Sequence, residues 1–263
     1  MKCAITGSTG VLGKNFIKKF PKIKFIKYQG NILNKKKLGN WILKNDFDYF
    51  LHFAAIVPTA IAKKDYNFVK KVNYEGTKNI AEKLLEKNKK VWLLFSSTSH
   101  VYGFSNKPLS EKNKINPISK YGLSKLLAEK IIKKKLKNSK IEYCIVRIFS
   151  FTDSSQNESY FVPGVFLNRI KYVNTLRDFI DIRDLCNAIH FLMKKRAKNI
   201  FNLGSGKKTN LNKIISIVQK RKIINMEKPK NNIVANINKI KSLGWKPKYN
   251  ILDTLKNFKK NYN

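Results

Sequence analysis

The sequence TGSTGVLG at residues 6–13 joins a short apolar run, residues 2–6, to a helical pattern at residues 11–19. Glycines in such a turn let the backbone fold tightly and approach a pyrophosphate closely, while the following helix offers free N–H groups and the positive end of its dipole. A glycine-spaced turn alone is also typical of ordinary strand-to-helix connections. Its position at the start of a strand–helix–strand pattern favours a phosphate-binding turn. The candidate cofactor-binding residues of this turn are Gly7, Thr9, Gly10, Val11 and Leu12.

Beyond this turn, apolar runs alternate with helical stretches, which is typical of a parallel sheet with helices on both faces. The predicted strands are residues 2–6, 24–28, 49–53, 91–96, 141–148 and 199–202. The predicted helices are residues 11–19, 35–44, 65–88, 119–137, 182–195, 211–220 and 252–260. The predicted fold class is therefore α/β, a Rossmann-type doubly wound parallel sheet with a small C-terminal substrate lobe.

The alternation becomes less regular after about residue 150, where Gly, Pro and Asn become frequent. We expect residues 1–150 to form a dinucleotide-binding domain, to which residues 174–203 return. Residues 151–173 and 204–263 are expected to form the small substrate-binding lobe.

The composition is that of a globular protein with an unusual charge. The chain has 263 residues, 43% of them apolar, and a net charge of +39. The sequence contains no run of about eighteen apolar residues, so no membrane span is predicted. The N-terminal residues do not resemble a signal peptide, and we therefore expect a cytoplasmic protein. A strongly basic chain raises the possibility of binding RNA or another polyanion. However, the positive residues are mostly Lys, spread along the whole chain, which favours a solvated surface that binds neither nucleic acid nor membrane.

The three cysteines lie far apart in the sequence. Cys3 and Cys144 fall in predicted buried strands and Cys186 in a predicted helix, so we expect core thiols rather than disulfides. No Cys/His cluster has the spacing of a zinc site, and no metal is expected.

Tyr121 and Lys125 lie four residues apart on one face of a predicted helix. A phenol with an ordinary pKa near 10 needs a nearby ammonium, which favours the phenolate, to act as an acid or base near neutral pH. This pair is a candidate acid/base site, although a Tyr and a Lys at this spacing also arise by chance in a Lys-rich chain.

A hydroxyl-rich segment, SSTSHVYG at residues 96–103, follows a predicted apolar strand. In an open α/β sheet, ligands bind beyond the carboxyl ends of the strands, so hydroxyls here are placed to hydrogen-bond a sugar oxygen. The alternative is a polar cap between a strand and a loop.

The adenosine end of the expected cofactor site is less typical. Dinucleotide sites place Asp or Glu after the second strand, where it holds the ribose 2′-OH. This chain instead has KYQGN at residues 27–31, without an acid, and Lys27 is compatible with a 2′-phosphate. The choice between NAD and NADP stays open.

Several motifs occur in a characteristic order along almost the whole chain. These are residues 6–13, HFAA at 52–55, VNYEGT at 72–77, residues 96–103, YGLSK at 121–125, RDFI at 177–180 and LGW at 243–245. Together they resemble the NAD-dependent epimerase/dehydratase family, the extended short-chain dehydrogenase/reductases.

The resemblance implies an enzyme with NAD or NADP as cofactor and assigns roles to individual residues. Thr98 matches the catalytic hydroxyl, Tyr121 the acid/base, and Lys125 the residue that tunes Tyr121 and holds the nicotinamide ribose. Ser99 and His100 match positions beside the substrate, and Arg177 matches a contact to the substrate phosphates, with a structural pairing to Asp178 or Asp181 as the alternative. The remaining implied cofactor contacts are Asn31, Ile32, Phe53, Ala54, Ala55 and Ser96.

Departures from the family pattern narrow the expected reaction. Dehydratases of the family have Asp-Glu after the catalytic hydroxyl, where this chain has Ser99-His100. His100 is therefore a candidate proton carrier, or else a hydrogen-bonding group only. The resemblance implies a homodimer acting on a nucleotide-diphosphate sugar, with hydride transfer at a hexose carbon, expected to be C4, as a 4-ketoreductase or a 4-epimerase. The alternative is a Rossmann-fold binding protein that uses its Lys-rich surface for RNA or another polyanion.

Overall fold

A six-stranded sheet forms the centre of the computed structural model, which describes residues 1–57, 64–223 and 229–261. Its strand order is β2-β1-β3-β4-β5-β9, and the pairs β1–β2, β1–β3 and β3–β4 are parallel. The strands are β1 (Lys2–Thr6), β2 (Lys24–Lys27), β3 (Tyr49–His52), β4 (Trp92–Thr98), β5 (Glu142–Ile148) and β9 (Asn199–Leu203). The predicted α/β, doubly wound fold is confirmed.

The direction of winding changes at β1, because β2 lies on one side of it and β3 on the other. In doubly wound folds the ligand crevice forms at such a switch point, beyond the carboxyl ends of the strands. The turn after β1 and the residues after β3 therefore share the edge at which a ligand is expected.

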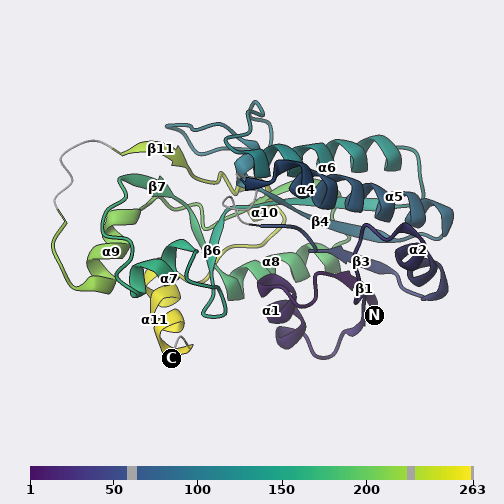
Figure 1. The fold of residues 1–263 in the computed structure, drawn as a ribbon, viewed down its shortest axis with the longest axis horizontal. Helices are drawn as coiled ribbons and strands as arrows, with labels where there is room; N and C mark the ends of the chain where they lie inside the picture. Colours follow the sequence, from purple (N-terminus) through teal and green to yellow (C-terminus); the bar gives the residue numbers. More distant parts are fainter. Residues whose placement is uncertain (58–63, 224–228, 262–263) are drawn as a thin grey trace. The chain divides into compact units, whose positions relative to one another are not determined.

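Helices cover both faces of this sheet. Figure 1 shows α1 (Val11–Lys19) on one face and α5 (Gly76–Glu86) with α6 (Lys120–Leu136) on the other. Next to α5 lies α2 (Lys35–Lys44), which begins at Asn34, whose side chain accepts a hydrogen bond from the Lys37 amide. Buried apolar side chains from the helices and strands form the core between them; they include Leu38, Ile42, Phe50, Ile80, Leu84, Leu93, Phe95 and Ile132.

The chain divides into two compact units. The first consists of Met1–Gly103, Lys114–Arg147 and Ile189–Phe201, and the second of Phe104–Asn113, Ile148–Ala188 and Asn202–Asn263. The helix α8 (Ile182–Lys194) contributes to both. Which unit binds the cofactor and which the substrate stays a prediction.

The second unit contains two small sheets and several short helices. One sheet has the order β10-β7-β11, from Thr209–Asn210, Thr175–Arg177 and Lys230–Ile233, and β6 (Ser150–Thr152) pairs with β8 (Phe179–Asp181). The helices are α7 (Phe161–Phe166), α9 (Leu211–Gln219), α10 (Asn238–Ser242) and α11 (Ile251–Asn261). Apolar side chains of α7, α9 and α11 meet one side chain of β8 in a core of Val162, Phe179, Leu211, Ile214, Leu255 and Phe258.

The predicted helix at residues 65–88 is confirmed over residues 66–86, but it contains a π-helical turn that the sequence pattern did not predict. The segment forms α4 (Tyr66–Lys70), a π-helical turn (Lys71–Glu75) and then α5. A π turn contains one residue more than a regular α-helical turn. Here the turn directs the Asn73 side chain inward, where it hydrogen-bonds to the backbone of Ile56. A tertiary contact therefore overrides the regular helical spacing.

The predicted burial of the cysteines is confirmed, since Cys3, Cys144 and Cys186 all lie in the core. Within the described residues, no helix is both long and apolar enough to cross a bilayer. The same residues contain no group of three or more His, Cys, Asp or Glu side chains arranged to hold a metal ion.

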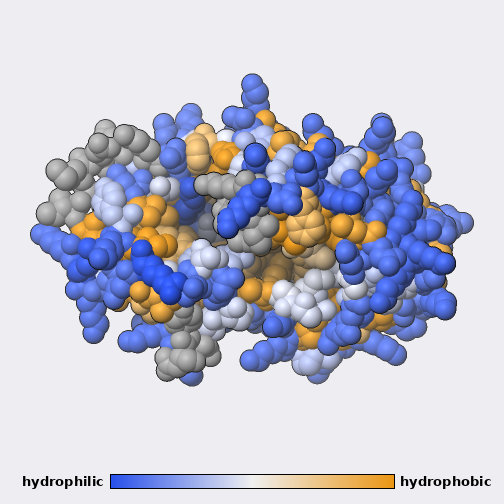
Figure 2. All heavy atoms as spheres, viewed as in Figure 1, coloured by the Kyte–Doolittle hydropathy of each residue, from blue (hydrophilic) through white to orange (hydrophobic). Residues whose placement is uncertain are grey.

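Hydrophilic side chains are spread over the whole visible face of the molecule and surround smaller apolar areas (Figure 2).

Candidate active site

The turn after β1 has the geometry of a phosphate-binding loop. Gly7 has φ +75°, and a Cβ there would lie 2.4 Å from the amide nitrogen of Ala54. A Cβ on Gly13 would lie 2.2 Å from the carbonyl oxygen of Gly7. These two glycines are therefore required by the packing of the protein itself.

Gly10 differs, because a Cβ there would meet nothing closer than the Gly7 carbonyl oxygen at 3.5 Å. The outer side of the loop is thus open at Gly10. Helix α1 begins at this residue without a side-chain cap and with no acid in its first turn. Its N–H groups and positive dipole end remain available to an anion.

Two of the predicted catalytic groups lie one turn apart at the start of α6. The helix begins after Ser119, whose hydroxyl accepts a hydrogen bond from the Gly122 amide at 3.0 Å. Tyr121 and Lys125 follow on the same face, with exposed fractions of 9% and 1%. The Lys125 ammonium lies 4.1 Å from the centroid of the Phe95 ring, and burial lowers the pKa of this Lys to about 7.

The hydroxyl segment packs against this first turn of α6. Thr98 ends β4, and its Oγ1 accepts a hydrogen bond from the His100 amide at 3.2 Å, which starts a short 3-10 turn (Ser99–Val101). The His100 carbonyl accepts from the Ile118 amide at 3.1 Å. A Cβ on Gly122 would lie 2.1 Å from the His100 carbonyl oxygen, so the two backbones are in direct contact.

His100 lies beside Tyr121. The two ring centroids are 6.0 Å apart with an edge-on orientation, and His100 Nδ1 lies 3.1 Å from Ser119 Oγ. The neighbouring Ser99 is buried. The structure thus brings His100, Tyr121 and the turn after Thr98 together, with Lys125 on the next helical turn.

A buried hydrogen-bonded His connects β1 to α5. Thr77 donates to the Asn73 carbonyl at 2.6 Å, so its oxygen accepts from His52 Nε2 at 2.9 Å. Thr6 then donates to His52 Nδ1, at 2.8 Å. Burial, with a smaller effect of Lys125, holds the pKa of His52 well below its usual value. His52 is therefore a neutral imidazole with its proton on Nε2.

Asn73 continues this connection toward α6. Its side chain accepts from the Ile56 amide at 2.8 Å and donates to the Ile56 carbonyl at 3.2 Å and to Ser124 Oγ at 3.0 Å. Ser124 donates in turn to the carbonyl of Tyr121 at 2.7 Å. Asn73 thus fixes the chain after β3 to the first turn of α6.

Arg177 lies on β7 in the second unit and is not paired with an acid among the described residues. Its guanidinium donates to the backbone carbonyls of Leu176, at 3.0 Å, and Asn231. Asp178 instead accepts from Ser205 and its neighbours, and Asp181 pairs with Arg183. The pairing of Arg177 with either acid is therefore wrong, and its charge is not neutralised by these carboxylates.

Comparison with known proteins gives the family. The sequence model described as the "NAD dependent epimerase/dehydratase family" matches residues 3–204. The chain belongs to this family. Among individual proteins, this family member is 30% identical to the "Putative UDP-glucose 4-epimerase" of Methanocaldococcus jannaschii over 267 residues, which is 92% of this chain and 86% of that protein.

One further relative and one solved structure are also similar to this chain. The "GDP-6-deoxy-D-talose 4-dehydrogenase" of Aggregatibacter actinomycetemcomitans is 28% identical over 216 residues, 76% of this chain and 72% of that protein. The crystal structure of a UDP-glucose 4-epimerase from Thermotoga maritima, solved with UDP-glucose, has a TM-score of 0.86 at 20% identity and covers 100% of this chain and 98% of its own. The second comparison concerns the fold alone.

The phosphate loop of this epimerase/dehydratase-family protein fits the diphosphate of NAD or NADP. Gly10 leaves the loop open, and α1 presents uncapped N–H groups beside it. Phe53 and Ala54 lie directly after β3, and the Phe53 amide donates to the Thr6 carbonyl at 3.1 Å, so both flank the loop. The contacts of these residues, and of Ala55, with a cofactor stay predictions.

Three other residues assigned to the cofactor already have structural roles. Ser96 donates to the His52 carbonyl at 3.1 Å, which ties β4 to β3. The Asn31 side chain accepts from the Leu33 amide, and Ile32 is buried against Gly76. No acid follows β2, which ends at Lys27.

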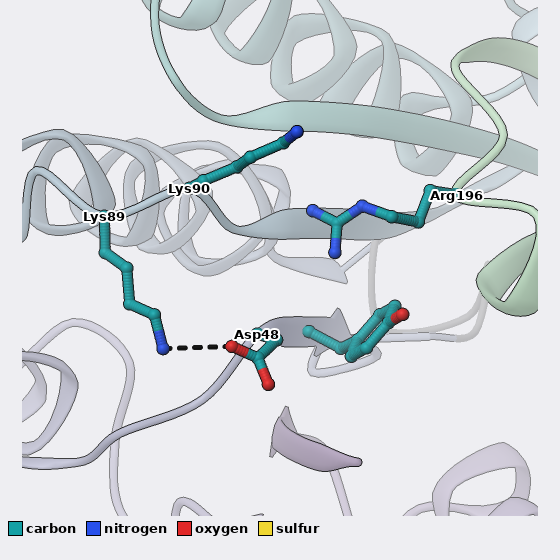
Figure 3. A pocket seen from close by; sticks show the side chains of 5 residues that line it. Asp48, Lys89, Lys90 and Arg196 are labelled. Atoms are coloured by element: carbon teal, nitrogen blue, oxygen red, sulfur yellow. Dashed lines mark hydrogen bonds and ion pairs between the residues drawn. The ribbon is translucent and has the colours of Figure 1, made fainter.

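A hollow of about 450 Å³ lies at the opposite edge of the sheet (Figure 3). It is lined by Asp48, Tyr49, Lys89, Lys90 and Arg196, next to the amino ends of β3 and β4. Lys89 pairs with Asp48 at 3.0 Å. Because ligands of doubly wound sheets bind beyond the carboxyl ends of the strands, this hollow is separate from the expected active site.

Sequence reasoning missed the role of Asn73 and of the buried pair Glu129 and Arg147. Asn73 lies within the recognised VNYEGT motif, but the motif alone gave it no partner. Glu129 stands four residues after Lys125 and eight after Tyr121, a spacing that places an acid on the same helix face as these two candidate residues. That spacing was the available signal.

Proposed function

We propose that this protein catalyses hydride transfer at C4 of the hexose of a nucleotide-diphosphate sugar, with Tyr121 as the acid/base. The observation that carries the proposal is the buried Tyr121–Lys125 pair, packed against the turn that follows Thr98. The protein that contains this pair belongs to the epimerase/dehydratase family, and its phosphate loop fits NAD or NADP. The names of the two similar proteins, a UDP-glucose 4-epimerase and a 4-dehydrogenase, support C4 as the reacting carbon.

NAD or NADP, when bound, takes up a hydride from the sugar carbon or returns one. The protein moves the accompanying proton: Tyr121 removes it from the sugar hydroxyl during oxidation and returns it during reduction. Thr98 Oγ1 accepts from the His100 amide, so its own hydrogen can be donated to the sugar oxygen. Lys125 stabilises the phenolate form of Tyr121 while it carries its own proton, which burial limits to pH values below about 7 in the protein without cofactor.

Arg177 is proposed to bind the substrate phosphates. Its guanidinium already donates to two carbonyls, which fix its position, and it has no ion-pair partner in the described part of the chain. A charge-assisted contact with a phosphate is among the stronger hydrogen bonds that a protein makes.

Because the epimerase similarity covers 92% of the chain, we expect interconversion of two C4 epimers. Net reduction of a 4-keto sugar uses the same residues and is the alternative. An epimerase regenerates its cofactor in each turnover, whereas a ketoreductase consumes reduced cofactor in proportion to product. Monitoring cofactor absorbance together with product identity therefore separates the two reactions.

The test is turnover of a panel of 4-hydroxy and 4-keto nucleotide-sugars with NAD, NADH, NADP and NADPH. Tyr121→Phe is expected to lower kcat by about 10²- to 10⁴-fold, the usual contribution of a general acid/base. Tyr143→Phe, which removes a phenol hydroxyl from β5, is the matched control. Near-full activity of Tyr121→Phe, or no turnover of any sugar by the wild-type protein, contradicts the proposal.

We also propose a cytoplasmic homodimer, on the strength of the family resemblance. The helices α4 and α6 pack together and expose two large apolar side chains, Phe68 at 46% and Leu123 at 39%. A second copy of the chain covering these side chains would remove that apolar area from water. Light scattering of the purified protein measures the expected dimer mass, and a monomer at micromolar concentration contradicts it.

A further inference from the structure

A buried ion pair connects α6 to β5 inside the first unit. Arg147 Nη2 lies 2.7 Å from Glu129 Oε2 and Arg147 Nε lies 3.0 Å from Glu129 Oε1, a two-point contact. The exposed fractions of the two side chains are 2% and 1%. Neither charge is in contact with bulk water, so each depends on its protein partners.

The pair has two further partners, which lie on either side of Thr98. Ser97 donates to Glu129 Oε1 at 2.6 Å. Arg147 Nη1 donates to the Tyr102 hydroxyl at 2.8 Å, and its guanidinium lies 4.8 Å from the Tyr102 ring centroid. The short segment 98–101, with the candidate catalytic hydroxyl and His100, is therefore held at both ends by one ion pair.

The same ion pair is attached to the helix of the acid/base pair. Tyr121, Lys125 and Glu129 follow one another at intervals of four residues, so they share one face of α6. Glu129 also opposes the effect of burial on Lys125, since its negative charge raises the pKa of the Lys125 ammonium. A change in the position of the Glu129 carboxylate would therefore affect both the segment 98–101 and the Tyr121–Lys125 face of α6.

We propose that Glu129 and Arg147 are positioning residues that hold Thr98 and His100 in register with Tyr121 and Lys125, for the reaction proposed above. Glu129 fixes the strand end before Thr98, and Arg147 fixes the residue after the 3-10 turn. Neither side chain touches the substrate. The two act through the hydroxyl segment.

Stability alone does not account for this arrangement. Buried ion pairs can often be replaced by apolar side chains of similar volume without loss of stability, because desolvation of the charges offsets their attraction. An apolar pair would fill the space between α6 and β5 but would have no acceptor for Ser97 and no donor for Tyr102. The ion pair instead fixes the orientation of the segment 98–101, because its hydrogen bonds hold Ser97 before the segment and Tyr102 after it.

The experiment uses two variants, a double variant that carries both Glu129→Met and Arg147→Met and the single variant Glu129→Gln. Each is compared with the wild-type protein. Glu142→Gln, which breaks the surface ion pair with Arg196, is the matched control. Folding is checked by circular dichroism and cofactor affinity by fluorescence titration. The proposal predicts folded variants with cofactor affinity within about threefold of wild type and kcat lowered at least tenfold, whereas KM for the sugar changes less than threefold.

A second readout needs no turnover. The His100 and Tyr121 rings lie edge-on at 6.0 Å, so their ring protons should give a nuclear Overhauser effect, assigned with His100→Gln. The proposal predicts that this signal is lost in the Met pair and kept in Glu142→Gln. If the wild-type protein turns over no sugar, the proposed function fails, but this signal still decides the positioning role. Folded Met-pair protein that keeps the ring contact, or keeps kcat within twofold, overturns the inference.

Discussion

Replacing Lys125 by Met should stabilise the protein while it removes activity. The Lys125 ammonium is buried against the Phe95 ring, and burial lowers its pKa from 10.5 to about 7. Met is of similar length and apolar, so it fills the same space without a charge. The gain in stability should depend on pH, since the cost of Lys125 exists only where the group carries a proton in the unfolded chain.

The sign and size follow from proton binding. Between about pH 7 and about pH 10.5 the unfolded chain holds a proton on Lys125 that the folded protein lacks, so the free energy of unfolding of the wild type rises with pH in this window. At about 1.4 kcal/mol for each pKa unit, the lowering corresponds to a cost of about 5 kcal/mol below pH 7. Of this cost, about 2 kcal/mol remains near pH 9.

Urea unfolding of the two proteins at about pH 6 and about pH 9, without added cofactor, measures this directly. The advantage of Lys125→Met in free energy of unfolding should shrink by about 2–3 kcal/mol over that range. Lys130→Met, at an exposed position of the same helix, is the control, and its difference from wild type should not depend on pH. A Lys125→Met advantage that is absent, or equal at both pH values, refutes the reasoning.

Three other substitutions test the phosphate loop and the hydrogen bonds of Asn73 behind it. Gly7→Ala places a Cβ at a positive φ, where it overlaps with the backbone of residues 53 and 54, and should lower the free energy of unfolding by at least about 2 kcal/mol. Gly10→Ala should change the free energy of unfolding by less than about 0.5 kcal/mol, but it should weaken cofactor binding. Urea unfolding and fluorescence titration measure both, and normal cofactor affinity in Gly10→Ala argues against the loop assignment. Asn73→Ala leaves the Ile56 amide and carbonyl without their side-chain partner, so a loss of about 1–3 kcal/mol is expected from thermal unfolding; an unchanged Tm would show that Asn73 does not hold the π turn.

The main sheet could be predicted because its strands carry a strong local pattern. Residues 3–5 and 143–146 are short apolar runs, typical of strands buried on both faces, and the structure places them in β1 and β5. The small sheets of the second unit had no such signal. Strands such as Thr209–Asn210 and Thr175–Arg177 are too short to show a period and are held by pairing with distant segments.

The candidate site likewise has one part that local spacing predicts and one part that depends on contacts between distant residues. The spacing of Tyr121 and Lys125 placed them correctly on one helix face, because a helix fixes that relation locally. The contacts of Asn73 and Arg147 join residues far apart in the sequence, and no local pattern indicates which distant group a buried side chain will meet. The alternative of Arg177 pairing with Asp178 or Asp181 failed for this reason, since both carboxylates bind other groups.

The π turn at Lys71–Glu75 sets the rotational phase between α4 and α5. With 3.6 residues in each turn, one inserted residue rotates everything after it by about 100° around the helix axis. Deleting a single residue there would make the two helices one straight rod, but the apolar stripe of α5 would then turn away from the sheet. The irregularity is therefore what allows one continuous stretch of chain to bury Val69 before it and Ile80 and Leu84 after it.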